Sequence, residues 1–399
     1  MLAVTMLTSS YPRNDQDEAG IFVARLAEAL AKLNLSVAVV VPHDKNEPTS
    51  EVSNTIQIRR FKYGLFTKGN LAFGAGMLPN IRRNPLRLLQ VPLYIVQTVR
   101  TALKAQTNPS LIHANWTLPL IAAWLLHLFW KLPYVVTIRG EDFRLLQKTP
   151  FRILLAPAIR RAHTIISVNQ SFLSFFTSTM KLPDSQVVCI TNGVSLPELQ
   201  VQEVTHFKQR YSLPSAPLLG YVGTIIPRKR IEVLIESLTQ KSLSGVHLLL
   251  AGRLTDLPYL HEIRALATRY KVHDRVHFLG PLPPHEVPLL LSAIDVYVTA
   301  SEFEGRPNAV LEALAAGKPS VVSKIEAHQE VIAQNQNGFL CTNAQDMAVA
   351  IASILQDKDL RERLASQAKL SVADKSWEHC AQRYLALYRQ IAPQQSKSA

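Results

Sequence analysis

Short apolar runs alternate with helix-forming stretches along the whole chain, and this alternation constrains the fold more than any other feature. Buried strands are predicted in the first half at residues 2–8, 37–41, 111–113, 134–138, 164–168 and 187–190, with a further alternating strand at 52–60. In the second half they are predicted at 218–222, 247–251, 276–279, 296–299 and 320–323. Helices are predicted between them, including 20–33 and 85–105. Such alternation is typical of parallel sheets covered on both faces. We therefore predict an α/β fold with two doubly wound, Rossmann-like sheets, each binding ligands at the carboxyl ends of its strands.

The length of the chain fits this organisation. At 399 residues it can form two or three domains with sizeable cores. With 47% hydrophobic and 18% charged residues, it is not a disordered chain. We expect an N-terminal domain at 1–197 and a C-terminal domain at 198–375, joined by a linker at 196–202. The remaining segment, 376–399, contains an amphipathic helix and a disordered tail at 393–399.

Cysteine usage and hydropathy indicate the compartment. The three cysteines, Cys189, Cys341 and Cys380, are far apart and have no metal-binding spacing, which favours buried thiols in a reducing environment. The first ten residues contain no basic residue and too short an apolar run for a signal peptide. The most apolar segment, 118–130, is shorter than the about 20 residues of a membrane span, so we interpret it as a core helix under a sheet. We expect a cytoplasmic protein.

Residues 301–319, SEFEGRPNAVLEALAAGKP, carry the strongest functional signal. A loop between Glu304 and Glu312 leads into a strongly helix-forming run, whose exposed N–H groups and positive dipole end can hold a phosphate. The amides that would do so are those near Asn308, Ala309 and Val310. Glu312, about one turn inside the helix, could accept hydrogen bonds from a ribose diol, and Glu304 from hydroxyls beyond the phosphates. The segment therefore predicts a nucleotide-sugar site.

A second segment supplies positive charge. Gly223 follows a predicted strand and opens the sequence GTIIPRKR, in which Arg228 and Lys229 precede a helix near residue 231. A leaving nucleoside diphosphate gains negative charge as its glycosidic bond breaks, and nearby cations stabilise that charge. The alternative is a solvated basic loop without a ligand.

The ordered motifs resemble those of the retaining glycosyltransferases of family four, the group 1 glycosyltransferases. The resemblance covers nearly the whole chain and rests on the two glutamates in E-x7-E spacing and on segments 4–42, 113–143, 192–194 and 220–319. It implies the GT-B architecture, in which two Rossmann-like domains face a cleft, and a terminal helix that crosses back to the N-terminal domain. It also implies that Lys229 binds the diphosphate. The mechanism most often proposed for the family is front-face, with the leaving diphosphate receiving the acceptor proton.

The sequence departs from the family pattern at two positions. Thr224 stands where many members have an arginine, a charge that Arg228 or Arg230 could supply. Arg139 stands where many have a histidine near the transferred sugar. Arginine cannot act as a base near neutral pH, but Arg139 could hold a sugar hydroxyl or a phosphate oxygen. The alternative is a structural pairing of Arg139 with Glu141 or Asp142.

The other candidate site residues in the first half have weaker support. Gly20 opens the first predicted helix and would let the backbone approach a diphosphate or acceptor, although a plain turn glycine fits as well. Asp15 and Asp17 form a D-x-D pattern, but it lies in the wrong half of the chain for a donor-metal site, and the pattern arises often by chance. We predict no metal and no cofactor.

The positive charge is concentrated in the first half. Residues 1–195 contain 21 Lys and Arg against 10 Asp and Glu, whereas residues 196–399 contain 22 against 20. Basic residues mixed with apolar ones at 59–63 and 82–87 suit an anionic membrane surface. Nucleic acid is disfavoured because no nucleic-acid-binding motif is present. A solvated basic face without a partner stays open.

Together with the resemblance, these observations lead us to expect a metal-independent, retaining glycosyltransferase that moves a sugar (a hexose in the expected case) from a nucleotide-sugar to a glycan or lipid-linked acceptor in surface-polysaccharide or glycolipid synthesis. It would be cytoplasmic, with peripheral contact to the membrane as a further expectation. Two alternatives stay open: a relative that binds nucleotide-sugars without transferring them, and a GT-B-fold nucleotide-sugar isomerase.

Overall fold

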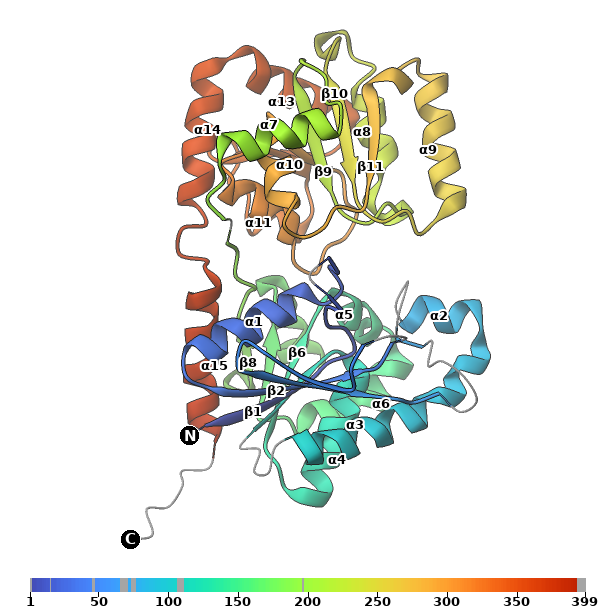
Figure 1. The fold of residues 1–399 in the computed structure, drawn as a ribbon, viewed down its shortest axis with the longest axis vertical. Helices are drawn as coiled ribbons and strands as arrows, with labels where there is room; N and C mark the ends of the chain where they lie inside the picture. Colours follow the sequence, from blue (N-terminus) through green and yellow to red (C-terminus); the bar gives the residue numbers. More distant parts are fainter. Residues whose placement is uncertain are drawn as a thin grey trace. The chain divides into compact units, whose positions relative to one another are not determined.

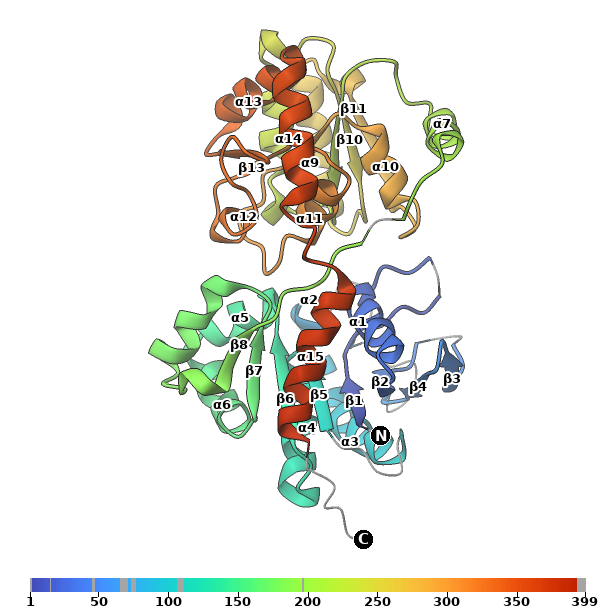
Figure 2. The ribbon, with the colours of Figure 1, turned by 90° about the vertical axis from the view of Figure 1, so that its left-hand side faces the viewer.

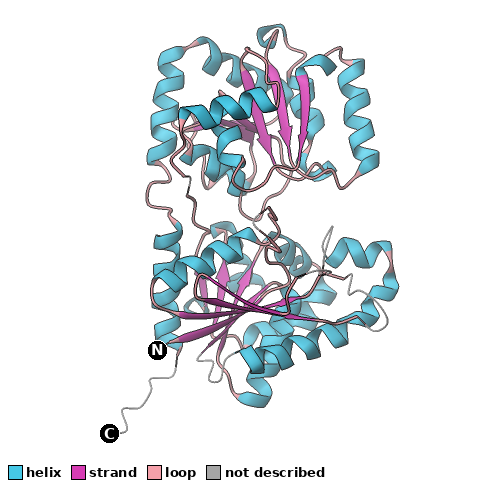
Figure 3. Cartoon of the chain, viewed as in Figure 1, coloured by secondary structure: helices cyan, strands magenta, loops and turns pink. Residues whose placement is uncertain are grey.

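The computed structural model describes residues 2–14, 16–44, 47–64, 71–72, 77–105, 111–195 and 197–392. The chain divides into two compact units, one formed by Met1–Gly193 with Trp377–Ala399 and the other by Val194–Ser376 (Figure 1). Each unit is a mainly parallel sheet with helices packed on its faces (Figure 3). The predicted α/β class with two Rossmann-like sheets is therefore confirmed. The expected domain limit at 197 falls inside the second unit, and both Leu196 of the predicted linker and the tail at 393–399 lie outside the described residues.

The sheet of the first unit has the strand order β3-β4-β2-β1-β5-β6-β7-β8. All neighbours are parallel except the β3–β4 pair at the edge. The strands are β1 (Ala3–Leu7), β2 (Ser36–Pro42), β3 (Ser50–Ser53), β4 (Ile56–Phe61), β5 (Leu111–Asn115), β6 (Tyr134–Ile138), β7 (Thr164–Ser167) and β8 (Val187–Cys189). The central strands β5 and β6 are buried at every position, because helices cover both of their faces.

The helices of the first unit form two layers. The α-helices are α1 (Ile21–Lys32), α2 (Met77–Arg83), α3 (Val91–Ala105), α4 (Thr117–Trp130), α5 (Gly140–Gln147), α6 (Thr149–Arg160) and α15 (Trp377–Ile391). The short helical turns are η1 (Pro85–Gln90), η2 (Gln170–Phe172), η3 (Phe175–Thr179) and η4 (Asp184–Gln186). Helices α1 and α15 pack together on one face of the sheet, and α3 and α4 lie on the other, with α6 against α4 (Figures 1 and 2).

Two elements differ from the sequence prediction. The single strand predicted at 52–60 is a hairpin, because Asn54 and Thr55 adopt positive φ angles of 47° and 70° that reverse the chain between β3 and β4. The single helix predicted at 85–105 is divided into η1 and α3. Pro92, in the first turn of α3, has no N–H with which to continue the hydrogen bonding of η1.

The basic cluster at 59–63 is only partly accessible, with Lys62 exposed and Arg59 half-buried. Arg60, Phe61 and Tyr63 are all buried, with 6%, 4% and 1% of their surface exposed. Arg60 forms an ion pair with Glu51 across the hairpin at 2.5 Å. The apolar side chains of Phe61 and Tyr63 are therefore not available to a membrane, and a contact through the accessible basic side chains of 59–63 stays a prediction.

The terminal helix α15 belongs to the first unit, where it packs on α1. A buried polar chain links it to the sheet: Tyr388 Oη lies 2.7 Å from His113 Nδ1, and His113 Nε2 lies 2.7 Å from Thr137 Oγ1. Thr137 Oγ1 lies 3.2 Å from Tyr384 Oη. Burial lowers the pKa of His113 to about 3, so the ring is neutral and one nitrogen accepts a hydrogen bond while the other donates.

The second unit has a six-stranded parallel sheet in the order β11-β10-β9-β12-β13-β14. Its strands are β9 (Leu218–Val222), β10 (His247–Ala251), β11 (Val276–Gly280), β12 (Val296–Thr299), β13 (Ser320–Ser323) and β14 (Gly338–Cys341). Its α-helices are α7 (Val201–Arg210), α8 (Ile231–Ser237), α9 (Leu257–Arg269), α10 (Val287–Ala293), α11 (Asn308–Ala315), α12 (Glu326–Gln329), α13 (Ala344–Gln356) and α14 (Lys358–Leu370). Three short turns, η5 (Pro227–Lys229), η6 (Lys241–Leu243) and η7 (His273–Arg275), complete it.

The apolar segment predicted at 118–130 forms α4, which packs on β5 and β6. Across the described parts of the chain, we find no helix with the length and apolar character needed to cross a bilayer.

Candidate active site

The second unit brings two loops together at the point where its strand order reverses. Strands β9 and β12 are direct neighbours, pairing Leu219 with Val296 and Gly220 with Tyr297. The chain leaves β9 toward β10 on one side and leaves β12 toward β13 on the other. Open parallel sheets bind ligands at such a switch point, outside the carboxyl ends of the strands. The loops that follow β9 and β12 are residues 223–230 and 300–307, which carry most of the predicted donor-site residues.

Hydrogen bonds tie these two loops to each other. The backbone N–H of Glu302 donates to the carbonyl of Arg228 at 2.9 Å. The Arg228 guanidinium in turn donates through Nη1 to the carbonyl of Phe303 at 2.8 Å. Arg228 and Glu304 are therefore held on adjoining loops without any ligand.

Glycines make room at the start of the first loop. Gly223 donates its N–H to the carbonyl of Ala251 at 2.9 Å, at the end of β10. Gly252, with a φ of 148°, packs so closely that a Cβ there would lie 1.9 Å from the carbonyl oxygen of Gly223. This contact requires glycine at position 252 and fixes where Gly223 leaves the sheet.

Lys229 and Glu304 form a direct ion pair between the two loops. Their side chains are only 15% and 14% exposed. Burial by itself raises the pKa of Glu304, but the charge and hydrogen bond of Lys229, a hydrogen bond from Ser301 and the charge of Arg228 outweigh it, so the pKa lies below its usual value. Glu304 is therefore ionised at neutral pH, beside two cations.

The structure distinguishes the two arginines that could replace the missing charge at Thr224. Arg228 contributes to the electrostatic field at Glu304. Arg230 adopts a positive φ of 51°, is 45% exposed and lies 3.9 Å from Glu232, which turns it toward α8. Arg228 is therefore the better candidate of the two.

The E-x7-E segment forms the loop and helix that the sequence predicted. Helix α11 begins at Asn308 after Pro307, which has no side-chain cap, so the amides of Ala309 and Val310 point out of the helix end. The N–H of Asn308 already donates to the carbonyl of Arg306 at 2.9 Å. Glu312 lies one turn further on and is half-buried. After burial, the charges of Glu304 and Glu312 are the next largest causes of a raised pKa for the buried Tyr297, so both carboxylates are near enough to act on that hydroxyl.

Three further polar side chains adjoin this cluster, and sequence reasoning did not select them. Ser301 donates to Glu304, and the 5% exposed Arg306 lies 3.9 Å from Glu330. His328, fully buried, bonds the carbonyl of Ser323 through Nδ1 at 2.7 Å, while its Nε2 has no hydrogen-bond partner among the described residues. Burial lowers the pKa of His328, so the ring is neutral and Nε2 is an acceptor. Arg306 lies inside the E-x7-E segment and could have been found there, whereas only folding brings His328 to the site.

Arg139 directly follows β6, and its guanidinium reaches Asn115 at the end of β5 and Phe22 in α1, beside the switch point where β1 and β5 are neighbours. Its guanidinium donates to Asn192 Oδ1 at 3.1 Å and to Asn115 Oδ1 at 3.2 Å, and it lies 4.1 Å from the ring centre of Phe22. No carboxylate in the described part of the chain lies within ion-pair distance of this guanidinium. The carboxylate of Asp142 instead accepts from the backbone N–H of Arg139 at 3.3 Å. Arg139 is thus a 93% buried cation whose Nη1 and Nη2 donate to amide oxygens beside an aromatic ring, and it forms no ion pair with Glu141 or Asp142.

The other first-unit candidates have structural explanations. Gly20 caps α1 with a φ of 71°, and a Cβ there would lie 2.3 Å from the carbonyl oxygen of Ser10, so its own loop already requires glycine. Asp17 forms an ion pair with Arg13 at 2.7 Å and accepts the N–H of Ala19. Asp15, the other carboxylate of the D-x-D pattern, lies outside the described residues.

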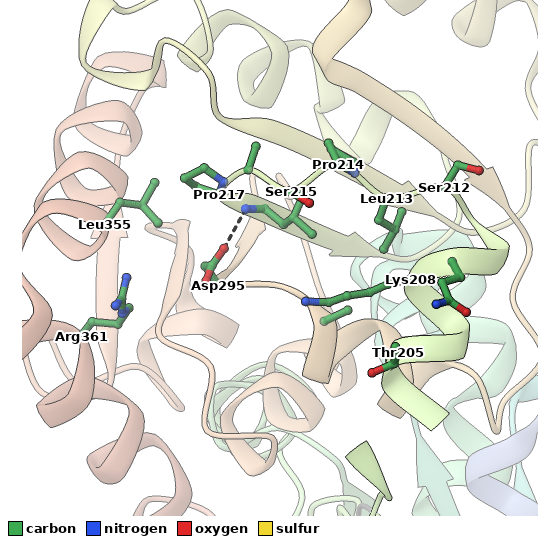
Figure 4. A pocket seen from close by; sticks show the side chains of 14 residues that line it. Thr205, Lys208, Ser212, Leu213, Pro214, Ser215, Pro217, Asp295, Leu355 and Arg361 are labelled. Atoms are coloured by element: carbon green, nitrogen blue, oxygen red, sulfur yellow. Dashed lines mark hydrogen bonds between the residues drawn. The ribbon is translucent and has the colours of Figure 1, made fainter. Parts of the chain in front are cut away.

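The second unit also has an open pocket of about 720 Å³ at the amino-terminal ends of its strands, opposite the candidate site. It is lined by the residues that precede β9, by Asp295 before β12, and by Lys208 and Arg361 (Figure 4). Asp295 accepts the N–H of Leu218 at 2.8 Å and so fixes the start of β9. None of the predicted site residues line this pocket, so it is not the candidate site.

Two parallel-sheet units, with a cation and carboxylate cluster at the switch point of the second, define the class as the GT-B glycosyltransferase fold. Sucrose-phosphate synthase from Thermosynechococcus elongatus superposes with a TM-score of 0.82 at 23% identity, over 98% of this chain and 99% of that chain. Anabaena HepE in complex with UDP and glucose gives a TM-score of 0.77 at 20% identity, over 98% and 100%.

Family models identify the family. The model "Glycosyl transferase 4-like domain" matches residues 18–193, and "Glycosyl transferases group 1" matches residues 204–371. The chain belongs to the group 1 glycosyltransferases, as its motifs predicted, and is a transferase.

Curated relatives agree with this assignment. D-inositol 3-phosphate glycosyltransferase of Corynebacterium urealyticum is 23% identical over 97% of this chain and 95% of its own length. The putative teichuronic acid biosynthesis glycosyltransferase TuaC of Bacillus subtilis is 26% identical over 88% of each. An uncharacterized glycosyltransferase of Methanocaldococcus jannaschii is 27% identical, but this match spans 56% of the chain and 59% of the relative.

Proposed function

We propose that this glycosyltransferase moves a sugar, with retention of configuration, from a nucleotide-sugar to a glycan or lipid-linked acceptor in surface-polysaccharide or glycolipid synthesis. The observation that carries the proposal is the ion pair of Lys229 and Glu304, with Arg228 beside it, at the switch point of β9 and β12. Cations beside a buried carboxylate are what a donor with a diphosphate and a hydroxyl-bearing sugar requires.

Each residue then has a separate part in binding the donor. Glu312 would accept hydrogen bonds from the ribose diol, and the first-turn amides of α11 would hold a phosphate oxygen at the positive end of the helix. Lys229 and Arg228 would face the remaining diphosphate oxygens. Glu304 would accept hydrogen bonds from hydroxyls of the sugar. Gly223, held against Gly252, leaves the β9 loop open for close approach of the nucleotide.

The reaction that suits this arrangement is a front-face substitution. The bond between the anomeric carbon and the diphosphate oxygen breaks, and its electron pair stays on the diphosphate, where Lys229 and Arg228 stabilise the added charge. The acceptor hydroxyl attacks from the same face, and its proton passes to the leaving phosphate oxygen. No side-chain base is required, which fits an arginine at position 139.

The role of Arg139 follows from its burial. A cation this deeply buried without an ion-pair partner is unfavourable, and its own pKa is lowered by burial. An anionic or hydroxyl oxygen brought to Asn115, Asn192 and Arg139 would add the acceptor that the guanidinium lacks at Nε. We assign Arg139 to hold a substrate oxygen in the first unit.

The first donor nucleotide to test is UDP. Solved structures of the same fold are named as complexes with UDP and UDP-glucose, and one as a complex with ADP. A panel of UDP-, GDP- and ADP-sugars tests the donor, with release of the nucleoside diphosphate as the readout.

Three variants test the site in the same assay. We expect Glu312→Ala to lose donor binding, and Glu304→Ala to lose turnover while the nucleoside diphosphate still binds in calorimetry. Glu302→Ala is the matched control, because this exposed carboxylate lies in the same loop and only its backbone joins the Arg228 contact. Normal transfer by Glu304→Ala would refute the assignment of Glu304.

Product analysis separates the alternatives. An isomerase would convert the nucleotide-sugar without releasing the diphosphate, and an inactive relative would bind it without any turnover. Failure of every nucleotide to bind would overturn the proposal as a whole.

A further inference from the structure

Exposed apolar side chains of the described residues are concentrated in one part of the first unit. Nine of the fourteen large apolar side chains that are exposed lie between residues 86 and 154. They are Leu86, Leu88, Leu89, Val96, Phe129, Trp130, Phe151, Ile153 and Leu154. Such clusters on a protein surface usually mark a binding surface, whereas scattered single side chains do not.

These residues belong to elements that lie side by side. Turn η1 packs on α3, α3 packs on α4, and α4 packs on α6, on the face of the sheet opposite α1 and α15 (Figures 1 and 2). Helix α4 contains no Lys, Arg, Asp or Glu, and four of its half-buried positions carry large apolar side chains: Ile121, Trp124, Leu125 and Leu128. We call this surface, formed by the outward side chains of η1, α3, α4 and α6, the α3–α4–α6 face.

The charge around this face has one sign. Between Glu51 and Glu141 the chain has no Asp or Glu but eleven Lys and Arg, of which, among the described residues, only Arg60 and Arg139 are buried. After Asp142, which is buried, the next acidic residue is Asp184. Basic side chains exposed in and beside the face include Arg82, Arg83, Arg100, Lys131 and Arg160. The partner of this surface must therefore be both apolar and negatively charged.

We propose that the α3–α4–α6 face docks on the surface of an anionic phospholipid bilayer, with its apolar side chains in the acyl boundary and its basic ones at the headgroups. A second copy of this chain would bring the same positive charge to the contact, and nucleic acid offers no apolar layer to cover Leu86 or Ile153. Because none of the described helices can span a membrane, the face lies in the interface plane.

This inference goes beyond the proposed transfer reaction and stands on the first unit alone. Only one consequence rests on the proposed function: a docked enzyme would reach acceptors anchored in the same bilayer. Nucleotide binding, measured beside vesicle binding, keeps the two proposals separable, since either can fail while the other holds.

Sedimentation with vesicles tests the proposal on the full chain. The protein should sediment with vesicles of phosphatidylcholine mixed with phosphatidylglycerol, and not with vesicles of phosphatidylcholine alone. Added salt should weaken binding, because exposed charges are screened over about 10 Å at 0.1 M ionic strength. Equal binding to both vesicle types, or to neither, would overturn it.

Two pairs of variants test the two kinds of side chain. Arg82→Gln with Arg83→Gln should weaken partitioning onto anionic vesicles about thirty-fold, from about a five-fold effect per basic residue. Ile153→Ser with Leu154→Ser, at positions 67% and 70% exposed, should weaken it about ten-fold or more.

Matched controls lie in the second unit. Val349→Ser with Leu370→Ser removes side chains that are 59% and 63% exposed, and Lys241→Gln with Lys271→Gln removes two exposed charges. These variants should bind vesicles as the wild type does. Unchanged nucleotide binding and circular dichroism in all variants would exclude misfolding as the cause of any loss. If test and control variants lost binding equally, the face would have no special role.

Trp130 gives a direct readout of insertion because it is 49% exposed and lies within the face. Its emission should shift to the blue on anionic vesicles, and Trp130→Phe should remove most of that shift. Binding without a blue shift would mean adsorption by charge alone and would refute apolar docking. Dissociation of a wild-type oligomer by Ile153→Ser with Leu154→Ser, without vesicles, would instead assign the face to a protein partner.

Discussion

Removing Lys229 should leave Glu304 as a buried carboxylate without its principal cation. Truncating one partner of a fully buried ion pair costs about 3–5 kcal/mol, and exposed pairs are worth at most about 1 kcal/mol. With both side chains about 15% exposed, we expect Lys229→Met to destabilise the second unit by about 3 kcal/mol. Glu304→Gln should cost about 1 kcal/mol, because the freed lysine can extend toward solvent while the amide keeps the bond from Ser301.

The double variant isolates the interaction between the two side chains. Lys229→Met with Glu304→Gln contains neither charge, so its loss should be about 2 kcal/mol smaller than the single losses combined. The pH dependence gives a second signature. In the wild type the pKa of Glu304 is lower when folded than when unfolded, so its stabilisation is present above the unfolded value of 4.5 and is lost as pH falls through the folded pKa. Without Lys229, most of the effect that offsets burial at Glu304 is gone. The pKa of Glu304 should then be higher in the folded than in the unfolded chain, so the pH dependence of its contribution to stability should reverse in sign.

The chain provides separate probes for the two units. All four tryptophans lie in the first unit, so their fluorescence follows that unit only. Cys341 is the single cysteine between residues 194 and 376 and is 4% exposed, and burial raises the pKa of its thiol to about 12, so it reacts only when the second unit unfolds. Pulse labelling of Cys341 across a urea series therefore measures the stability of the second unit. Single-variant losses that add to within about 0.5 kcal/mol would show that Lys229 and Glu304 do not interact, and would refute the reasoning.

Three other predictions concern the framework around the site. Burial raises the pKa of Asp142 to about 6, so the folded first unit binds more protons than the unfolded chain and loses stability as pH rises from 3.8 to about 6. Asp142→Asn should remove this pH dependence of the free energy of unfolding, measured by urea unfolding with tryptophan fluorescence. An unchanged pH dependence would contradict the prediction. Tyr388→Phe breaks the 2.7 Å bond to buried His113 and should cost the first unit about 1–3 kcal/mol without affecting Cys341 labelling. Gly252→Ala places a Cβ 1.9 Å from the Gly223 carbonyl and should destabilise the second unit by about 3 kcal/mol and weaken nucleotide binding, whereas Gly245→Ala, where a Cβ meets no atom within 4 Å, should cost less.

The sequence predicted the fold well because its strands are continuous apolar runs, which need no long-range information to be recognised. The prediction of single elements failed where one or two residues change the direction of the chain. The alternating run at 52–60 looks like a single strand, and only the positive φ of Asn54 and Thr55 turns it into a hairpin. Pro92 was likewise a visible signal for the break between η1 and α3, but a proline is also compatible with the first turn of one long helix.

The residues of the candidate site could be selected from sequence, but their pairings could not. Glu304 and Lys229 are 75 positions apart, and the adjacency of β9 and β12 that joins them follows from strand order alone. His328 shows the same limit, since nothing near it in sequence marks it as a neighbour of Glu304. Arg139 was predicted to pair with an acidic neighbour or to hold a substrate. Only the folded unit shows that Asn115 and Asn192 accept its hydrogen bonds in place of an acidic neighbour.

The pairing of Lys229 with Glu304 also constrains how a donor can bind. Without a ligand, each side chain neutralises the other. A diphosphate that approaches Lys229 brings further negative charge toward Glu304, and this repulsion opposes binding of a nucleoside diphosphate alone. In the proposed site a nucleotide-sugar would offer hydroxyl donors to Glu304 at the same moment, so the carboxylate would exchange one partner for another and stay satisfied despite its burial. In the proposed reaction Glu304 would therefore discriminate the loaded donor from the spent nucleotide, and the pair that stabilises the empty site would also favour release of the product.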